Sequence, residues 1–591
     1  MNWRFIGICI SALTASGAAA WAQGAPPAAG LPRPPPTRPV TDAMLQNPPP
    51  GDWLMWRRTL DSWGYSPLDR INSSNVKGLR LAWSRGLPQE GKQEGTPLVH
   101  EGVMYMPLPL DAIAAYDAKT GDLFWEHRRK IPDDLRQFIP HPDTNRNIAI
   151  YGDLILDTSA DGYLFALDKM TGRLVWETQV TDFHRNAAQQ TSGPIVADGK
   201  AISGRGCEPE GGPDACVMTA HDARTGKELW RTRTIPKPGE PGYESWGDVP
   251  EASRWHVGTW MTPSYDPELK LVYFGTSVTS PAPKFALGGN DKTHLYHNST
   301  LALDVNTGKI VWHYQHLVDH WDLDHPFERL IVDTAIAPDP KTVQWINPRL
   351  KRGEARKVIT GIPGKTGVVY TLDARTGEFL WATPTIKQTV VRSIDGATGV
   401  ATVNPDSLFH KIGDTVLACP SGNGGKNWMA GAYSPLTKTM YFPLQNTCAT
   451  ATVILDKPSL DSLYGLRLRS SIAENARDVG SVWAISTETG ATRWKYEQRA
   501  ATMSLVATGG GLLFGGDAAG AFRAFDQKTG KVLWETRLGA PVSGYPIAYA
   551  VNGRQYIVAS TGASLSVGGL TALTPEIRPG VSNQIFVFAL E

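Results

Sequence analysis

The stretch Ala115-Tyr116-Asp117-Ala118-Lys119-Thr120-Gly121, followed by Trp125, sets a pattern that returns along the chain. Its frame is Ala-x-Asp-x-x-Thr-Gly-x-x-x-Trp, with substitutions at single positions. Further copies end at Trp176, Trp230, Trp312, Trp381, Trp494 and Trp534. Leu81-Ala82-Trp83 looks like one more copy that has lost its turn. The repeat accounts for much of an unusual composition, with 20 Trp against 16 Phe.

Each copy has the features of a β-hairpin. The apolar residues before Asp predict a strand, Asp caps the turn by accepting backbone N–H bonds, and Gly supplies a positive φ. The next strand carries Trp to a large apolar contact. One such unit cannot bury its own faces, so the copies must stack. The sequence therefore predicts an all-β fold, an eight-bladed β-propeller with docked tryptophans, and an open solenoid is the alternative. We expect the strand-like Gln584–Phe588 to pair with N-terminal residues and close the ring.

The N-terminus indicates export. Arg4 precedes an apolar run from Phe5 to Leu13, and Ala20-Trp21-Ala22 resembles a cleavage site. We expect a signal peptide over 1–22, a Pro-rich leader, disordered or extended, over 23–50, and one propeller domain over 51–591; a membrane anchor is the alternative for the first segment. The predicted location is the periplasm. The net charge of +1 gives no reason to expect nucleic acid or an acidic membrane as partner.

Four cysteines remain beyond the predicted signal peptide, an even number in an exported protein. Three pairings are possible, and local spacing favours Cys207 with Cys216 and Cys419 with Cys448. The sequence contains no Cys-x-x-Cys-His, so no covalently attached c-type haem is expected.

Several loops carry polar motifs: Glu94-Gly95-Thr96-Pro97, Asn145-Arg146, Gly364-Lys365-Thr366-Gly367 and Gly424-Gly425-Lys426-Asn427-Trp428. From about Trp53 to Glu591, loops and repeat together resemble the quinoprotein alcohol dehydrogenases, propellers that hold pyrroloquinoline quinone (PQQ) on their axis. The repeat alone is shared with non-catalytic outer-membrane assembly lipoproteins, so the loops carry the distinction.

The resemblance implies a set of PQQ contacts. Arg146 pairs with a cofactor that bears three carboxylates, and Trp260 stacks flat under its ring. Lys365 lies beside the quinone oxygens. The remaining implied contacts are Glu94, Ser159, Thr191, Asn427 and Trp428.

The resemblance also implies a metal and a base. Gly206-Cys207-Glu208 resembles the loop that offers a Glu to the metal, and oxygen ligands suit Ca²⁺. In His320-Trp321-Asp322-Leu323-Asp324, Asp322 is the expected catalytic base, with Glu208 and Lys365 assisting. Asp324, on the same side in an extended segment, is typical of members that use a lanthanide, and the alternative is a solvent-facing or loop-capping carboxylate.

Two positions depart from the family pattern. The family supplies a metal ligand as Asn in Gly-Thr-Gly-Asn, whereas this chain has Val278 there, so either Asp324 replaces that ligand or the site is weak. The family's adjacent Cys-Cys pair is replaced by Pro140-His141. His141 is interpreted as a substrate contact or a surface histidine.

The implied reaction is oxidation of an alcohol to an aldehyde or ketone, with electrons passed to a periplasmic cytochrome c. The lost Cys-Cys pair and the long inserts favour a bulky secondary alcohol, with the branch that acts on deoxynivalenol as one possibility. The alternatives are a non-catalytic assembly scaffold and a dehydrogenase for sugars or a polymer.

Overall fold

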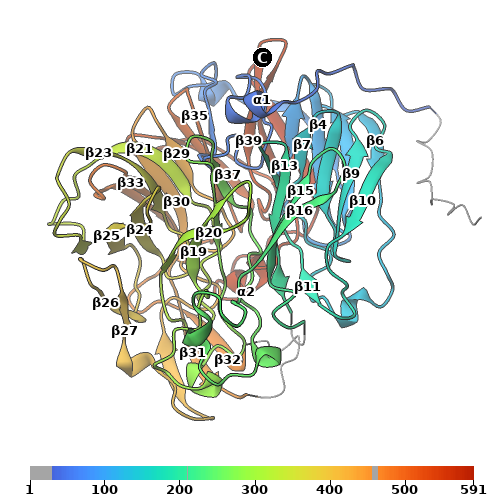
Figure 1. Ribbon diagram of the computed structural model, residues 1–591. Coiled ribbons are helices and arrows are strands. Elements are labelled where there is room, and N and C mark those ends of the chain that lie inside the picture. Colours follow the sequence, from blue (N-terminus) through green and yellow to red (C-terminus); the bar gives the residue numbers. More distant parts are fainter. Residues whose placement is uncertain (1–29, 209–210, 456–463) are drawn as a thin grey trace, which may run out of the picture.

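The protein is described here by a computed structural model, which covers residues 30–208, 211–455 and 464–591 (Figure 1). The predicted signal peptide, 1–22, lies outside the described residues. Strands dominate, and the only α-helices of the described part are the short α1 (Asp42–Gln46) and α2 (Val567–Thr571). The prediction of a mostly β fold is therefore confirmed. No helix in the described ranges is long and apolar enough to cross a membrane.

Eight sheets of the described part have four or five strands, and most follow chain order from first to last strand. The first four sheets use these strands: β3 (Leu98–His100), β4 (Val103–Leu108), β5 (Ala112–Asp117), β6 (Leu123–His127); β7 (Ala149–Tyr151), β8 (Leu154–Thr158), β9 (Tyr163–Asp168), β10 (Leu174–Gln179); β12 (Ile195–Ala197), β13 (Lys200–Gly204), β15 (Val217–Asp222), β16 (Glu228–Arg233); β17 (Ser264–Asp266), β18 (Leu271–Gly275), β19 (Ser299–Asp304), β20 (Ile310–Gln315).

The other four sheets complete the series. Their strands are β21 (Leu330–Ile336), β23 (Glu354–Gly361), β24 (Val368–Asp373), β25 (Phe379–Pro384) with β22 (Trp345–Ile346); β29 (Ala432–Ser434), β30 (Thr439–Gln445), β33 (Gly480–Ser486), β34 (Thr492–Gln498); β35 (Thr502–Thr508), β36 (Leu512–Asp517), β37 (Ala521–Asp526), β38 (Val532–Arg537) with β1 (Tyr65–Ser66); and β39 (Ile547–Val551), β40 (Arg554–Thr561), β41 (Gln584–Ala589), β2 (Arg80–Gly86).

The repeated turns join the third and fourth strands of these sheets as the sequence predicts. Asp117 Oδ1 accepts bonds from the backbone N–H groups of Lys119 and Thr120, at 2.7 and 3.2 Å, and Gly121 has φ +81°. The same capping recurs at Asp168, Asp222, Asp304, Asp373 and Asp526. Each turn is thus closed locally by its own side chain.

The repeated tryptophans link each sheet to the next. A Cβ on Gly172 would lie 2.4 Å from Cε3 of Trp125, so the indole lies directly on the following turn. The same contact joins Gly121 to Trp83, Gly226 to Trp176, Gly308 to Trp230, Gly377 to Trp312 and Gly530 to Trp494, and a looser one, at 3.1 Å, joins Gly490 to Trp381. Only glycine leaves room for such an approach.

The C-terminal strand closes this cycle. β41 pairs antiparallel with β2, from Arg80 with Ala589 to Gly86 with Gln584. Trp534, whose next sheet contains β41, packs edge-on against Phe588 at 5.3 Å. The predicted pairing of the two chain ends is therefore confirmed.

Smaller sheets extend from this body. They are β11 (Ala188–Gln189) with β14 (Gly206–Cys207), β26 (Val391–Ile394) with β27 (Ala401–Val403), and β28 (Thr415–Ala418), β31 (Thr447–Val453) and β32 (Leu466–Ile472). In Figure 1, β31 and β32 lie at the bottom and α1 at the top. Val40 and Leu45 are buried and Val40 pairs with Gly152, so this end of the predicted leader is packed against the body.

Candidate functional site

Most predicted site residues lie in loops that enter the first strand of a sheet. Glu94 precedes β3, Arg146 precedes β7, Trp260 precedes β17 and Trp428 precedes β29. These loops are far apart in sequence, yet several of their side chains are in contact.

Glu94, Arg146, Trp260 and Trp428 form one cluster, called here the arginine cage. The Arg146 guanidinium and the Glu94 carboxylate are 2.8 Å apart, and both side chains are almost fully buried. The guanidinium carbon lies 5.4 Å from the ring centroids of both Trp260 and Trp428. A buried guanidinium that is held between two indoles presents fixed N–H donors to a planar, carboxylate-bearing ligand.

The loop between β40 and β41, which carries α2, fixes two members of the cage. Glu94 Oε1 accepts bonds from Ser564 Oγ at 2.8 Å and from the Leu565 backbone N–H at 2.6 Å. The Trp428 indole N–H donates to Ser566 Oγ at 3.2 Å. A loop of the last sheet in chain order therefore fixes Glu94, which precedes the first sheet, and Trp428, which precedes the sixth.

Lys365, Asp322 and Asp324 form a second cluster, called here the lysine cluster. Lys365 Nζ lies 2.7 Å from Asp322 Oδ1 and 3.2 Å from Asp324 Oδ2. Burial opposes a charged ammonium, but the two carboxylates outweigh it and raise the pKa of Lys365 above its usual value. Lys365 therefore stays protonated between two acidic groups.

The two acids of this cluster differ. Burial, with the neighbouring Asp324 charge, raises the pKa of Asp322 well above its usual value although Lys365 opposes this. Burial also acts on Asp324, but Lys365, His256 and the Val278 N–H, which donates at 2.9 Å, hold the pKa of Asp324 below its usual value. Asp322 is thus the stronger proton acceptor of the pair.

Val278 contacts the cluster through its backbone. Its N–H donates to Asp324 Oδ1, so the position that departs from the family pattern orients Asp324. The described residues contain no group of three or more His, Cys, Asp or Glu side chains close enough to hold a metal ion. Glu208 and the two aspartates therefore do not form a closed ligand set in this structure.

Glu208 borders the same buried region. Burial alone raises the pKa of its carboxyl to about 8, and Oε2 has no hydrogen-bond partner among the described residues. Burial raises the pKa of Tyr464 well above its usual value, and the charges of Asp322, Asp324 and Glu208 add to this. All three carboxylates therefore act on one phenol.

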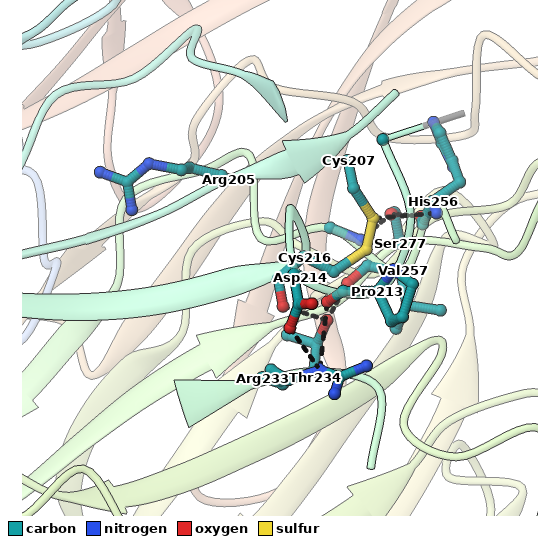
Figure 2. Close-up of a disulfide and its surroundings, with 12 residues drawn as sticks. Arg205, Cys207, Pro213, Asp214, Cys216, Arg233, Thr234, His256, Val257 and Ser277 are labelled. Atoms are coloured by element: carbon teal, nitrogen blue, oxygen red, sulfur yellow. Dashed lines mark hydrogen bonds and ion pairs between the residues drawn. A yellow bond between two sulfur atoms is a disulfide. The ribbon is translucent and has the colours of Figure 1, made fainter. Parts of the chain in front are cut away.

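The disulfides follow the favoured pairing. Cys207 is bonded to Cys216 and Cys419 to Cys448, which confirms the prediction. Figure 2 shows the first bridge, with the His256 backbone N–H donating to Cys207 Sγ at 3.0 Å. Cys207 adjoins Glu208 in sequence, and the bond from His256 ties it to the segment that leads to Trp260.

The other predicted residues divide into two groups. The Thr191 carbonyl accepts from Arg146 Nη1 at 3.3 Å, and Asn427 Oδ1 accepts from the Trp428 N–H at 2.7 Å, so both adjoin the cage. The Ser159 hydroxyl instead contacts the Asp161 carboxylate. His141 is half-buried, and burial, followed by the Lys92 charge, lowers its pKa to about 4.

Sequence reasoning missed buried residues that pack against the residues of these clusters. Lys426 Nζ and Glu328 Oε2 form a fully buried pair at 2.7 Å, and Lys426 lies 4.6 Å from the Phe327 ring. Phe327 in turn meets Trp260 edge-on at 5.5 Å, which connects this pair to the cage. Asp319 was also missed. An Asp is common in turns because its side chain accepts hydrogen bonds from backbone N–H groups a few residues further on.

Comparison with known proteins decides the family. The PQQ family model for the beta-propeller domain of glucose, ethanol and alcohol dehydrogenases matches residues 53–394 and 495–557. The chain belongs to the quinoprotein alcohol dehydrogenase family. A dehydrogenase subunit of a quinone alcohol dehydrogenase from Komagataeibacter europaeus is 32% identical over 87% of this chain and 72% of its own length.

Two further proteins are similar to this chain over most of its length. The lupanine 17-hydroxylase [cytochrome c] of Pseudomonas is 29% identical over 91% of this chain and 77% of its own. The structure of the quinohemoprotein alcohol dehydrogenase ADHIIG from Pseudomonas putida superposes with a TM-score of 0.82 at 27% identity, over 94% of this chain and 82% of the other. The quinoprotein is therefore a PQQ-dependent alcohol oxidoreductase, which sets aside the non-catalytic scaffold.

Proposed function

We propose that this quinoprotein is a periplasmic, haem-free dehydrogenase that uses PQQ and a metal ion to oxidise a bulky secondary alcohol to the ketone. The observation that carries the proposal is the contact of Asp322 with Lys365 at 2.7 Å, in a buried region that also borders Glu208. A base, a fixed cation and an unpaired carboxylate suit alcohol oxidation better than binding alone.

The arginine cage fits PQQ. Arg146 Nε is buried and has no hydrogen-bond partner in the described part of the chain. Buried donors of this kind favour an acceptor, and a PQQ carboxylate is one that a guanidinium can bind. Trp260, partly buried and 5.5 Å from Phe327, offers a ring face for a flat quinone.

Glu208 fits a hard cation. A buried carboxylate whose Oε2 lacks a donor, within the described residues, is an environment that Ca²⁺ or a lanthanide ion would satisfy. We propose Glu208, Asp322 and Asp324 as protein ligands, with Asp324 in place of the amide lost at Val278. Binding then requires these carboxylates to approach one another more closely, with Lys365 kept beside Asp322.

Bound PQQ would supply the oxidant, a quinone that accepts two electrons from the alcohol. Asp322 would accept the hydroxyl proton, for which its raised pKa suits it. Lys365 would hold the base in position and could offer its positive charge to the oxygens of the quinone. The chain contains no c-type haem motif, so the proposed acceptor of the electrons is a separate cytochrome c.

Substrate, location and domain plan are parts of the same proposal. Pro140-His141 replaces a pair of cysteines next to Arg146, which favours a bulkier alcohol. The signal-like N-terminus favours the periplasm, and the cyclic contacts among the eight sheets favour one closed eight-bladed domain over 51–591. A dehydrogenase for sugars or a polymer is the second candidate, because the same replacement at residues 140–141 would also admit such substrates.

The test is reconstitution of the apoprotein with PQQ plus either Ca²⁺ or a lanthanide, followed by a screen of primary alcohols, bulky secondary alcohols, sugars and polyvinyl alcohol with an artificial electron acceptor. We expect the highest kcat/KM with a bulky secondary alcohol. Asp322→Asn should bind PQQ with wild-type stoichiometry and lose turnover by about 10²- to 10⁴-fold. Wild-type turnover in that variant would refute the assignment of the base.

A further inference from the structure

We infer that Asp319 is a positioning residue that holds Asp322 in the conformation required for its contact with Lys365. The inference rests on the proposed function, because it takes Asp322 to be the base. The residues 319–325 are called here the base loop. Asp319 itself has no described contact with Lys365 or with the arginine cage, so it would act through the backbone around Asp322.

The backbone of Asp322 has a conformation that a side chain disfavours. Its φ is +67°, in the left-handed region, where residues other than glycine are uncommon and strained. The residue is nevertheless an aspartate, because its carboxylate has to reach Lys365 Nζ. Other contacts must therefore hold the base loop in this shape.

Asp319 supplies contacts on both sides of the strained residue. Its Oδ1 accepts a hydrogen bond from the backbone N–H of Trp321 at 2.7 Å, and its Oδ2 accepts one from the N–H of Leu323 at 2.5 Å. The two donors flank Asp322 in sequence. One carboxylate thus holds the N–H of the residue before the base and the N–H of the residue after it.

Asn298 adds a second clamp from another segment. Its Nδ2 donates to Asp319 Oδ2 at 3.1 Å and to the Leu323 carbonyl at 3.0 Å. The Asp319 N–H donates to His297 Nε2 at 3.0 Å, which fixes the start of the base loop to the same segment. Asp319 and Asn298 are both fully buried, so water cannot replace these bonds.

The repeated turns show what the same device does elsewhere. Asp526 Oδ1 accepts bonds from the N–H groups of Lys528 and Thr529 at 3.0 and 2.9 Å, in an exposed turn remote from the site. There the capping only closes a hairpin. At Asp319 the bonds enclose a strained residue that has a chemical role, so we expect a loss there to be seen in turnover.

The decisive variant is Asp319→Asn, which keeps the volume but replaces one acceptor oxygen by a donor. Asp319 accepts from three N–H donors, so at least one then faces another donor. We expect kcat to fall by about 10- to 100-fold, as for a small displacement of a catalytic group, with KM within threefold and full PQQ uptake. The matched control, Asp526→Asn, should leave kcat unchanged.

A second variant covers the case in which Asp319→Asn fails to fold. Asn298→Gly removes the amide and tolerates the φ of +46° at that position. We expect a smaller fall in kcat, and less than additive effects when both substitutions are combined, because they act on one clamp. A wild-type kcat in either folded variant would overturn the inference.

The outcome for Asp322→Asn separates the two levels of the argument. If that variant is inactive while Asp319→Asn turns over normally, only the positioning role fails. If Asp322→Asn turns over normally, the base assignment fails, whatever Asp319 does.

Discussion

The tryptophans of the repeat and those of the arginine cage use the same side chain in different ways. Trp125 lies on the Cα of Gly172, and its indole N–H donates to the Lys169 carbonyl at 3.1 Å. Trp260 and Trp428 instead lie 5.4 Å from the Arg146 guanidinium. An indole over a glycine gains close packing, whereas an indole beside a cation gains an electrostatic contact with its ring face.

The difference teaches how the chain separates stability from function. The packing tryptophans occur once per sheet, so each one carries a share of the contacts between sheets. The cage tryptophans lie in loops that no other copy of the repeat reproduces. We therefore expect substitutions in the first group to change the free energy of unfolding, and substitutions in the second to change cofactor binding.

Trp125→Ala should have the largest effect on stability. It removes a 2%-exposed indole together with its contact on Gly172 and its hydrogen bond. We expect the free energy of unfolding to fall by about 3–5 kcal/mol, measured by denaturant unfolding. PQQ uptake by the folded fraction should stay at the wild-type level. Loss of PQQ affinity with unchanged stability would contradict the division between the two groups.

Trp260→Leu should show the opposite behaviour. We expect PQQ affinity to fall by roughly 30-fold, about 2 kcal/mol, because a ring face is lost while an apolar side chain remains. Fluorescence titration of the apoprotein with PQQ measures this. The control is Trp312→Leu, which removes an indole bonded to the Ala374 carbonyl and should lower stability alone. Equal PQQ affinities for the two variants would remove the basis for the comparison.

Gly530→Ala should destabilise the protein more than Gly511→Ala. The two glycines have nearly equal φ values, +71° and +73°, so the backbone strain is matched. A Cβ at residue 530 would lie 2.5 Å from Trp494 Cε3, whereas a Cβ at 511 meets nothing within 4 Å. We expect an excess loss of about 1–2 kcal/mol at 530, by thermal or denaturant unfolding. Equal losses would mean that the indole contact adds nothing.

The repeat was predictable from the sequence because its determinants are local. Asp117, Gly121 and Trp125 lie within eleven residues of Ala115, and turn chemistry decides their roles. The pairing of β2 with β41 was also predictable, because the copy of the repeat that contains Trp83 needs partner strands to complete a sheet. The family pattern also located Arg146, Lys365 and Asp322, which the structure brings into two clusters.

The support of the base loop was not predictable in this way. Asp319 and Asn298 are separated by 21 residues, and their contact depends on how β19 and the following segment fold back. Likewise, the pairing of Lys426 with Glu328 spans 98 residues. Ordinary polar residues carry these contacts, and their spacing has no period, so a single sequence gives no signal for them.

Ser486→Asp should have the smallest effect, and it tests the repeat at the turn where serine stands in place of the aspartate. Ser486 Oγ accepts a single backbone bond, from Thr489 at 3.2 Å, where Asp526 accepts bonds from two N–H groups and from Thr529 Oγ1. Restoring Asp adds acceptors, but Ser486 is only 3% exposed, so burial of the charge opposes part of the gain. We expect a net stabilisation of about 0.5 kcal/mol by thermal unfolding, while Ser486→Ala should destabilise by a similar amount. If Ser486→Asp is instead less stable than Ser486→Ala, the cost of burying a charge at this turn outweighs the gain from capping it.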